Sequence, residues 1–214
     1  SIIYKMAEEQ IKRKCIKLAM LGDSQVGKTA ICQSLMNLEF NENALSTIGS
    51  DKLETPMRMK NGEDIKLVIY DTAGQERFRA IALKSIKHVQ GVVVVFDVNN
   101  KATFDNVVNW LKIIKENYKS VCIVLFGNKI DKSQEERQVT KEVAEKFAAD
   151  NNLKYFETSA KLKKGITEGF DYIGNLSYEK YEGSAGIQLG DVKKKKKDED
   201  GGGCCGGGKK SNKK

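Results

Sequence analysis

The sequence predicts an α/β fold, with a six-stranded, mostly parallel sheet, one antiparallel edge strand, and helices on both faces. Short, nearly continuous apolar runs alternate with amphipathic stretches from Cys15 to about Tyr181. This pattern is typical of parallel strands covered on both faces and joined by crossover helices. One hairpin signal, Asn61-Gly62, lies between the second and third runs, so that pair is expected to be antiparallel. With 214 residues, the chain is long enough for one full domain and short for two.

Six segments have the composition of strands. They are Cys15–Leu21, Ser50–Met59, Ile65–Asp71, Gly91–Val98, Val121–Asn128 and Lys154–Thr158. Among the helices, Thr103–Tyr118 is the clearest, because its apolar side chains recur at helical spacing. The other helices are predicted to begin near Lys28, Arg77, Thr140 and Ile166.

The second predicted strand alternates between an apolar and a polar face. Leu53, Thr55, Met57 and Met59 share one face, and charged residues occupy the other. Pro56, the single proline of the chain, has no N–H to donate to a neighbouring strand. The strand is therefore predicted to lie at the edge of the sheet with one face in water.

Beyond Gly183 the apolar pattern ends. The five lysines Lys193–Lys197, an acidic triplet and a glycine run around Cys204-Cys205 cannot bury a core. We therefore predict that Ser184–Lys214 is disordered. The expected organisation is an N-terminal extension over 1–14, one folded domain over 15–183 and a basic tail over 184–214.

The basic charge belongs mostly to this tail. The net charge is +8, and from residue 184 onward nine lysines face four acidic residues. A nucleic-acid-binding domain would carry such an excess on its folded surface, so no nucleic acid partner is expected. A basic tail fits an anionic membrane leaflet better. Lys193–Lys197 also fits a nuclear-import signal or simple solvated charge.

The cysteines and the start of the chain favour the reducing cytosol. Cys15, Cys32 and Cys122 lie in apolar or amphipathic segments and fit small core positions. No C-x-x-C pair occurs, and the single histidine leaves zinc ligation unsupported. Residues 1–10 lack the apolar segment of a signal peptide. The longest apolar run, Val92–Phe96, is far too short to span a bilayer.

A phosphate-binding motif follows the first predicted strand and opens a helix. The pattern G-x-x-x-x-G-K-T covers Gly22–Thr29. Backbone amides of such a loop cradle the β- and γ-phosphates of a nucleotide. Lys28 is placed to neutralise the phosphates, and the Thr29 hydroxyl is expected to bind Mg²⁺. The predicted nucleotide-binding residues of this segment are Asp23, Ser24, Gln25, Val26, Gly27, Lys28, Thr29 and Ala30.

A second motif, beginning at Asp71 and reading D-T-A-G-Q-E, ends the third predicted strand. A carboxylate at the carboxyl end of a strand beside the phosphate loop can hold Mg²⁺ through water, which is the role predicted for Asp71. Gly74 can donate its amide to a γ-phosphate, and Gln75 can orient an attacking water.

Two further motifs at the ends of later strands indicate the base. They are Asn128-Lys129-Ile130-Asp131 and Thr158-Ser159-Ala160-Lys161. The Asp131 carboxylate can accept hydrogen bonds from the N1–H and 2-amino groups of guanine, whereas adenine lacks that donor pair. The Ala160 amide can donate to the 6-oxo group. The predicted base-site residues are Asn128, Lys129, Asp131, Ser159, Ala160 and Lys161.

Together these motifs resemble the Ras superfamily of small GTPases over about Cys15–Tyr181, and the D-T-A-G-Q-E-R-F stretch with the paired cysteines is most similar to its Rab family. The resemblance implies the P-loop NTPase fold of small GTPases, GTP or GDP as bound nucleotide and Mg²⁺ as cofactor. It implies hydrolysis of GTP to GDP, with Lys28 and Gln75 as catalytic residues and slow turnover without a GAP. It further implies that Thr47 ligates Mg²⁺ and that Phe40 packs on the guanine ring, although Phe40 also fits an ordinary core position.

The same resemblance implies two switch segments, switch I over 41–50 and switch II over 74–89. An exchange factor, a GAP and effectors would read them, and an escort or GDI-type protein is a further expected partner. The sequence departs from the usual Rab pattern where aromatic residues meet these partners. Lys52 stands in place of phenylalanine, Tyr70 in place of tryptophan, and Ser85–His88 in place of Tyr-Tyr-Arg-Gly. Partner choice is therefore expected to differ from that of typical Rab proteins.

Hydrolysis is also expected to be slow. Ala44 stands where an aromatic residue can fold over the phosphates, and Gln25 replaces a small residue near the γ-phosphate.

Cys204-Cys205 resembles the double-geranylgeranyl site of Rab proteins, but nine residues follow it. The pair is a candidate lipidation site, and two free thiols in a flexible tail is the alternative.

The expected function is a Rab-type GTP-hydrolysing switch that regulates vesicle and membrane traffic. We expect a monomer in the cytoplasm that cycles to the cytosolic face of an intracellular membrane. Two alternatives remain open at this stage: a slowly cycling, GTP-bound scaffold with atypical switch surfaces, and a soluble transport GTPase similar to Ran.

Overall fold

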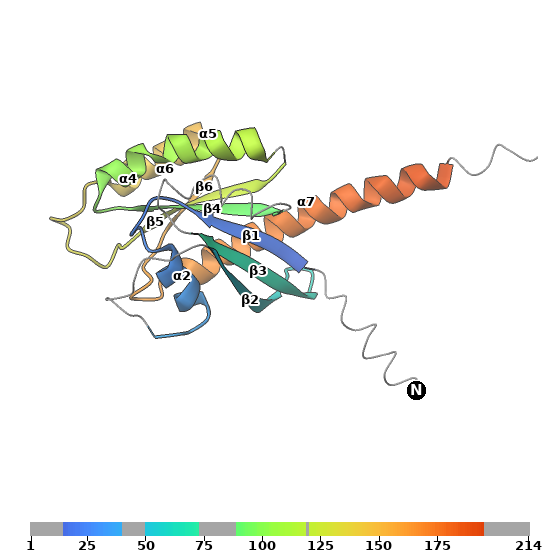
Figure 1. Cartoon of the computed structure of the whole chain (residues 1–214), viewed down its shortest axis with the longest axis horizontal. Helices are drawn as coiled ribbons and strands as arrows, with labels where there is room; N and C mark the ends of the chain where they lie inside the picture. Colours follow the sequence, from blue (N-terminus) through green and yellow to red (C-terminus); the bar gives the residue numbers. More distant parts are fainter. Residues whose placement is uncertain (1–14, 40–49, 73–88, 119, 195–214) are drawn as a thin grey trace, which may run out of the picture. The chain divides into compact units, whose positions relative to one another are not determined.

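The computed structural model describes residues 15–39, 50–72, 89–118 and 120–194. Six strands form one sheet in the order β2-β3-β1-β4-β5-β6, with helices on both faces (Figure 1). Every neighbouring pair is parallel except β2 and β3. The strands are β1 (Cys15–Leu21), β2 (Ser50–Arg58), β3 (Asp64–Thr72), β4 (Gly91–Asp97), β5 (Cys122–Asn128) and β6 (Lys154–Glu157). The predicted fold class is confirmed.

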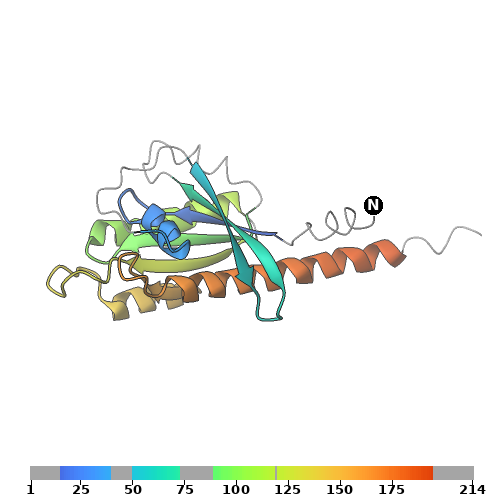
Figure 2. The same cartoon turned by 90° about the horizontal axis from the view of Figure 1, so that it is seen from below.

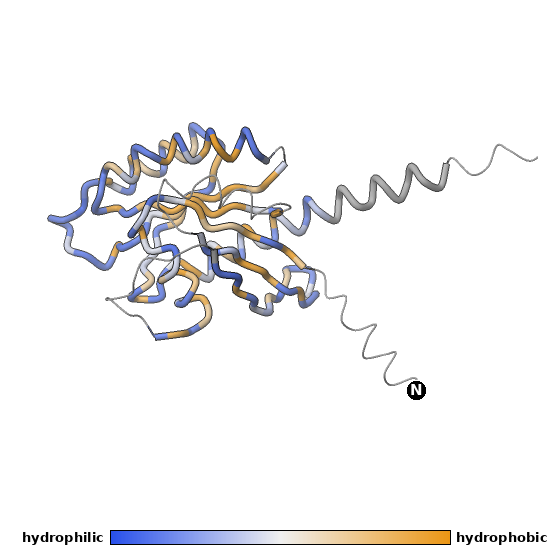
Figure 3. Tube along the Cα trace, viewed as in Figure 1, coloured by the Kyte–Doolittle hydropathy of each residue, from blue (hydrophilic) through white to orange (hydrophobic). Residues whose placement is uncertain are grey.

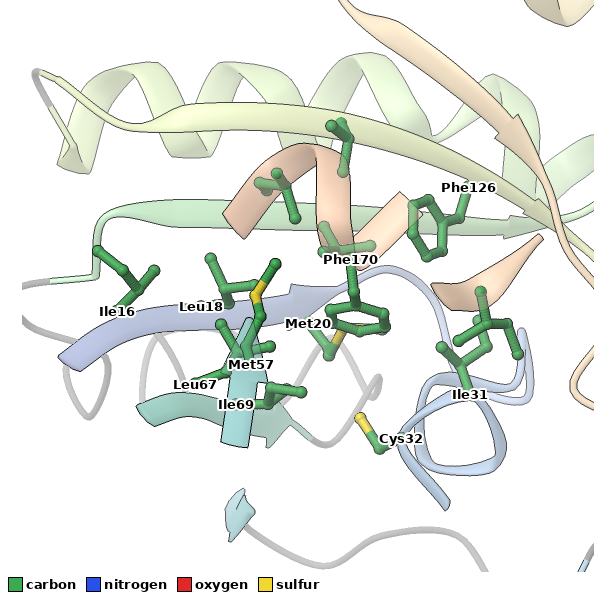
Figure 4. Packing of buried hydrophobic residues seen from close by; sticks show 14 of the residues in the cluster. Ile16, Leu18, Met20, Ile31, Cys32, Met57, Leu67, Ile69, Phe126 and Phe170 are labelled. Carbon is green, nitrogen blue, oxygen red and sulfur yellow. The ribbon is translucent and has the colours of Figure 1, made fainter. Parts of the chain in front are cut away.

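Each central strand contributes side chains to both of two hydrophobic cores. From β1, Leu18 and Met20 enter one core and Leu21 enters the other. The first core lies toward the helices α2 (Lys28–Leu35) and α7 (Ile166–Lys194), and Figure 4 shows Phe170 of α7 close to these β1 side chains. The second lies toward α4 (Lys101–Asp105), α5 (Val107–Asn117) and α6 (Lys141–Asp150). The most apolar stretches accordingly follow the inner strands (Figure 3).

The β2–β3 hairpin lies at one edge of the sheet, as predicted (Figure 2). The turn places Gly62 at φ 86°, a backbone conformation that favours glycine. Met57 and Met59 are buried, whereas Lys52 and Glu54 on the other face are exposed. The Met59 amide donates to the Glu63 carbonyl, so in this register Pro56 falls at a position whose N–H would point away from β3, and its absence costs the sheet no hydrogen bond.

The predicted helix Thr103–Tyr118 is two helices rather than one. It begins earlier, because the Asn100 side chain caps α4 by accepting a hydrogen bond from the Ala102 amide. Asn106 ends α4 and precedes α5. The interruption is one residue long, because Asn106 keeps right-handed helical backbone angles and its carbonyl oxygen still accepts from the Trp110 amide. Its side-chain amide donates to Asp23.

The prediction of disorder from residue 184 onward is wrong for residues 184–194, whose backbone is helical as the end of α7. No proline interrupts this segment, so every residue in it keeps the backbone donor that a helix needs. The chain divides into two compact units, Ser1–Glu179 and Lys180–Lys214. In the stretches of chain that are described, no helix combines the length and the apolar character needed to cross a membrane.

Candidate nucleotide site

The phosphate-loop motif connects β1 to α2 and depends on two glycines. Gly27 is at φ 97°, and a Cβ there would lie 2.4 Å from Asn128 Nδ2. Gly22 is at φ 144°, and a Cβ there would lie 2.2 Å from the Val95 carbonyl oxygen. A side chain at either position would therefore push the loop away from β4 or β5. The glycines allow the loop to pass close to the carboxyl ends of these strands.

Lys28 begins α2 and is almost completely buried. Its Nζ donates to the carbonyl oxygens of Gly22, at 3.0 Å, and Asp23, at 2.8 Å. Burial lowers the pKa of Lys28 from 10.5 to about 8, and the nearby carboxylates of Asp71 and Asp23 partly oppose this shift. The lysine thus places a cation inside the curve of the loop, where phosphate oxygens would be neutralised.

Thr29 and Asp71 meet beside this lysine. The Thr29 hydroxyl donates to Asp71 Oδ2 at 2.6 Å, and the Asp71 side chain is buried. Thr72 fixes the end of β3 by donating from Oγ1 to the Met20 carbonyl of β1 at 2.7 Å. A hydroxyl and a carboxylate are oxygen ligands of the kind that Mg²⁺ prefers, so the residues present fit this ion.

Asn128 at the end of β5 ties the phosphate loop to the base side of the site. Its Nδ2 donates to the Val26 carbonyl oxygen at 2.9 Å, and its Oδ1 accepts from the Thr158 hydroxyl at 3.3 Å. Asn128 and Thr158 are buried. A polar group that lost its partner here could not form a replacement hydrogen bond with water. This bridge therefore fixes the spacing between the two halves of the site.

Asp131 and Ser159 come together from the segments after β5 and β6. The Ser159 hydroxyl donates to Asp131 Oδ1 at 2.5 Å and accepts from the Leu162 amide at 3.0 Å. Ala160 is buried beside them. The serine therefore fixes one carboxylate oxygen of Asp131, which orients the carboxylate for a pair of donors on a base.

Sequence reasoning missed two residues that hold Lys129. Its Nζ forms an ion pair with Asp97 Oδ2 at 2.8 Å, and its carbonyl oxygen accepts from Asn99 Nδ2 at 3.0 Å. Lys129 has a positive φ of 67°, so these contacts support an unusual backbone conformation. A signal existed: Asp97 ends β4, and the carboxyl ends of parallel strands meet at one edge of a sheet.

Sequence reasoning also missed Asn106, at the N-terminal cap of α5, and Trp110 within α5, which both contact the phosphate loop. Both donate to the Asp23 carboxylate. The spacing 106–110 places the two residues on one helix face, but nothing in the sequence indicates that this face meets the loop.

The other predicted residues fall into two groups. Ser24 and Ala30 are half-buried in the loop and in α2, whereas Gln25, at φ 63°, and Lys161 are exposed. The remaining predicted site residues lie outside the described residues; these are Phe40, Thr47, Gly74, Gln75, Cys204 and Cys205, together with nearly all of both switch segments.

The outer face of the β2–β3 hairpin carries ion pairs. Lys52 lies directly opposite Tyr70, the two positions where aromatic residues were expected from the resemblance. Glu54 pairs with Lys52 at 2.6 Å and with Lys66 at 2.9 Å. This face is therefore charged and exposed to solvent.

The family whose model matches the chain is described as "Ras family", and the match covers residues 17–178. Human Ras-related protein Rab-8B is 42% identical over 155 residues, which are 72% of this chain and 74% of that protein. Ras-related protein Rab-13 of Mesocricetus auratus is 40% identical over 158 residues, covering 73% of this chain and 77% of that protein. Ras-related protein Rab-8 of Diplobatis ommata is 43% identical over 155 residues, covering 72% and 73%.

Proposed function

We propose that the residues described above form one guanine-nucleotide site, since this chain belongs to the Ras family of small GTPases. Some of these residues hold the phosphates, some hold Mg²⁺ and some select the base. As a divergent Rab-like member, the chain is a GTP-binding switch of membrane traffic that hydrolyses GTP to GDP. The scaffold and Ran-like alternatives are not favoured, because these relatives are all Rab proteins. The observation that carries the assignment is the Asn128 bridge, which joins the phosphate loop to the Asp131–Ser159 pair.

The phosphate half of the site consists of the loop amides and Lys28. The amides between Asp23 and Thr29 hold the phosphate oxygens at the start of α2, where the helix dipole favours negative charge. Lys28 neutralises charge that develops on the transferred phosphoryl group. Its short bonds to two loop carbonyls support this role, because they keep the ammonium inside the loop.

Thr29 and Asp71 would hold Mg²⁺, with Asp71 acting through a water and Thr47 as a further ligand. The ion, when bound, would supply positive charge to the phosphates. Thr29 and Asp71 already lie within hydrogen-bond distance of each other, which supports a shared task.

The base half of the site selects guanine. Asp131 accepts from the N1–H and 2-amino groups, the Ala160 amide donates to the 6-oxo group, and Ser159 keeps the carboxylate in place. Asn128, Lys129 and Lys161 complete this half. Adenine would leave the carboxylate without two donors, which makes its binding costly.

Hydrolysis and switching depend on residues of the two switch segments. Gln75 would place the attacking water, and Thr47 and Gly74 would sense the γ-phosphate, so that both segments change when it leaves. We expect hydrolysis to be slow because of Ala44 and Gln25. A single-turnover GTPase rate well above that of human Rab-8B under the same conditions would contradict this expectation.

Exchange factors, a GAP, effectors and a GDI-type protein interact with Rab-like GTPases in general. For this chain we propose that they meet switch segments whose neighbouring hairpin face is charged through Lys52, Glu54 and Lys66. We also propose that the tail attaches the protein to the cytosolic face of an intracellular membrane, with Cys204 and Cys205 as lipid acceptors and the lysine run as an electrostatic aid.

The guanine assignment is tested by a substitution at Asp131 that should change which base the site prefers. The wild-type protein is expected to bind GDP at least about a hundredfold more tightly than ADP. In Asp131→Asn, the amide would accept from N1–H and donate to the 2-oxo group of xanthine. This variant should therefore lose GDP affinity and gain xanthosine diphosphate affinity.

Competition with a fluorescent nucleotide measures the affinities for GDP, ADP and xanthosine diphosphate. Asp105→Asn, which changes an exposed carboxylate on α4, is the matched control and should bind as the wild type does. Equal binding of ADP and GDP by the wild type, or unchanged base preference in Asp131→Asn, would overturn the assignment.

A further inference from the structure

The carboxylate of Asp23 in the phosphate loop is bound by two residues, Asn106, which immediately precedes α5, and Trp110 within α5. A single oxygen, Oδ1, accepts from Asn106 Nδ2 at 2.6 Å and from Trp110 Nε1 at 2.8 Å. Trp110 is buried in the second core, so its indole N–H has a fixed direction. The loop is thus attached to a helix that contributes no residue to the predicted motifs.

The orientation of the Asn106 amide is also determined. The Asp23 carboxylate only accepts hydrogen bonds, so the Asn106 nitrogen faces it, and Asn106 Oδ1 accepts from Asn109 Nδ2 at 2.7 Å. Asn109 is exposed. A continuous chain of hydrogen bonds therefore runs from the solvent-facing side of α5 to the phosphate loop.

These contacts solve an electrostatic problem. An aspartate in a loop that receives phosphates would repel them if its carboxylate faced the ligand. Two donors, one at the N-terminal cap of α5 and one within it, engage one oxygen of this carboxylate, while the backbone carbonyl of the same residue accepts from Lys28 at 2.8 Å. Asp23 is fixed through both its side chain and its backbone, and the adjoining loop amides are fixed with it.

We propose that Asn106 and Trp110 are positioning residues of the nucleotide site. Acting through Asp23, they hold the loop in its phosphate-binding shape and set how slowly nucleotide is released. The proposal rests on the proposed function, because it assigns the site's kinetics to α5. It makes α5 a second support of the loop, in addition to the Asn128 bridge to Val26.

A charge exchange tests the proposal. Asn106→Asp places a second carboxylate against Asp23, and we expect GDP release to be faster by about tenfold or more. In the double variant Asp23→Asn with Asn106→Asp, the new amide at residue 23 can rotate so that its oxygen accepts from Trp110 Nε1 while its Nδ2 donates to the carboxylate of residue 106. This restores the pairing with the same total charge, so GDP release should return to within about threefold of wild type. Asn117→Asp, an exposed position on the same helix, is the matched control.

Two further measurements separate positioning from a general loss of structure. Trp110→Phe keeps an aromatic ring in the core but removes the donor, and we expect it to speed GDP release by about threefold to tenfold. The ratio of GDP affinity to inosine diphosphate affinity should stay at its wild-type value in every variant, because the base half is untouched.

Release is followed with a fluorescent GDP analogue in the full chain with Mg²⁺. Wild-type release rates in Asn106→Asp, or a double variant no slower than the single one, would overturn the proposal. So would a changed base preference in these variants. Failure of the wild type to prefer guanine nucleotides would instead count against the proposed function, so the two failures are distinguishable.

Discussion

The carboxyl edge of the sheet and the outer face of the β2–β3 hairpin hold their polar groups in opposite ways. At the carboxyl edge, Asp71 and Asn128 are buried and bonded to other parts of the protein. On the hairpin, the side chains of Lys52 and Glu54 remain 54% and 38% exposed although they form an ion pair. A buried polar group that loses its partner cannot form a replacement hydrogen bond with water, whereas an exposed polar group can. The difference predicts large effects of substitution at the first region and small effects at the second.

Lys28→Met is expected to have the largest effect. The change removes the cation that faces the phosphates, and GDP affinity should fall by about a hundredfold or more. Two effects on stability oppose each other: burial of a charge is relieved, but the carbonyls of Gly22 and Asp23 lose a donor. The variant should therefore fold, which circular dichroism checks alongside nucleotide titration.

Lys141→Met is the matched control for that substitution. Lys141 is exposed on α6 and pairs with Glu145 only at 3.7 Å. GDP affinity should not change in this variant. If Lys28→Met bound GDP as tightly as the control does, the contrast between the two regions would lose its main support.

A smaller effect is expected from pH, again through Lys28. Its folded pKa of about 8 lies below the ordinary 10.5. Below pH 8 Lys28 is protonated in both the folded and the unfolded chain, so the folded state bears the full cost of burying its charge. Between about pH 8 and 10.5 Lys28 loses its proton in the folded chain but keeps it in the unfolded chain. The stability contribution of this group therefore rises with pH over that window, by up to about 3 kcal/mol.

Nucleotide binding should respond in the opposite direction. Phosphates favour the charged lysine, so above pH 8 binding takes up a proton, and GDP affinity should fall by up to about tenfold per pH unit. Affinities between pH 7 and about 9, with Lys28→Arg as the variant that stays charged, measure this. An identical pH dependence in the two proteins would show that Lys28 is not the titrating group.

The same contrast explains how far the sequence could predict the structure. The sheet, the edge position of β2 and the strand bounds to within one residue followed from apolar periodicity and from Asn61-Gly62, because those signals are local. The meeting of Thr29 with Asp71 was also predictable, since each residue ends or follows a strand that leads to the same edge.

Contacts between a loop and a helix face were not predictable in this way. The donation from Trp110 to Asp23 joins residues 87 positions apart and depends on how α5 packs over β4, which no local signal determines. The helical continuation of α7 beyond residue 183 was missed because the apolar pattern on which the prediction depended ends there.

Glu54→Gln on the hairpin is expected to have the smallest effect. Hydrogen bonds from Lys52 and Lys66 lower the pKa of Glu54 to about 2, which alone would suggest a strong interaction. The carboxylate is, however, open to solvent, and water and salt replace the lost partners at little cost. Thermal denaturation should give a melting temperature within about 2 °C of wild type, and GDP affinity should be unchanged. A clear loss of stability at physiological salt would mean that the hairpin face is held as firmly as the carboxyl edge, and that exposure does not separate the two regions.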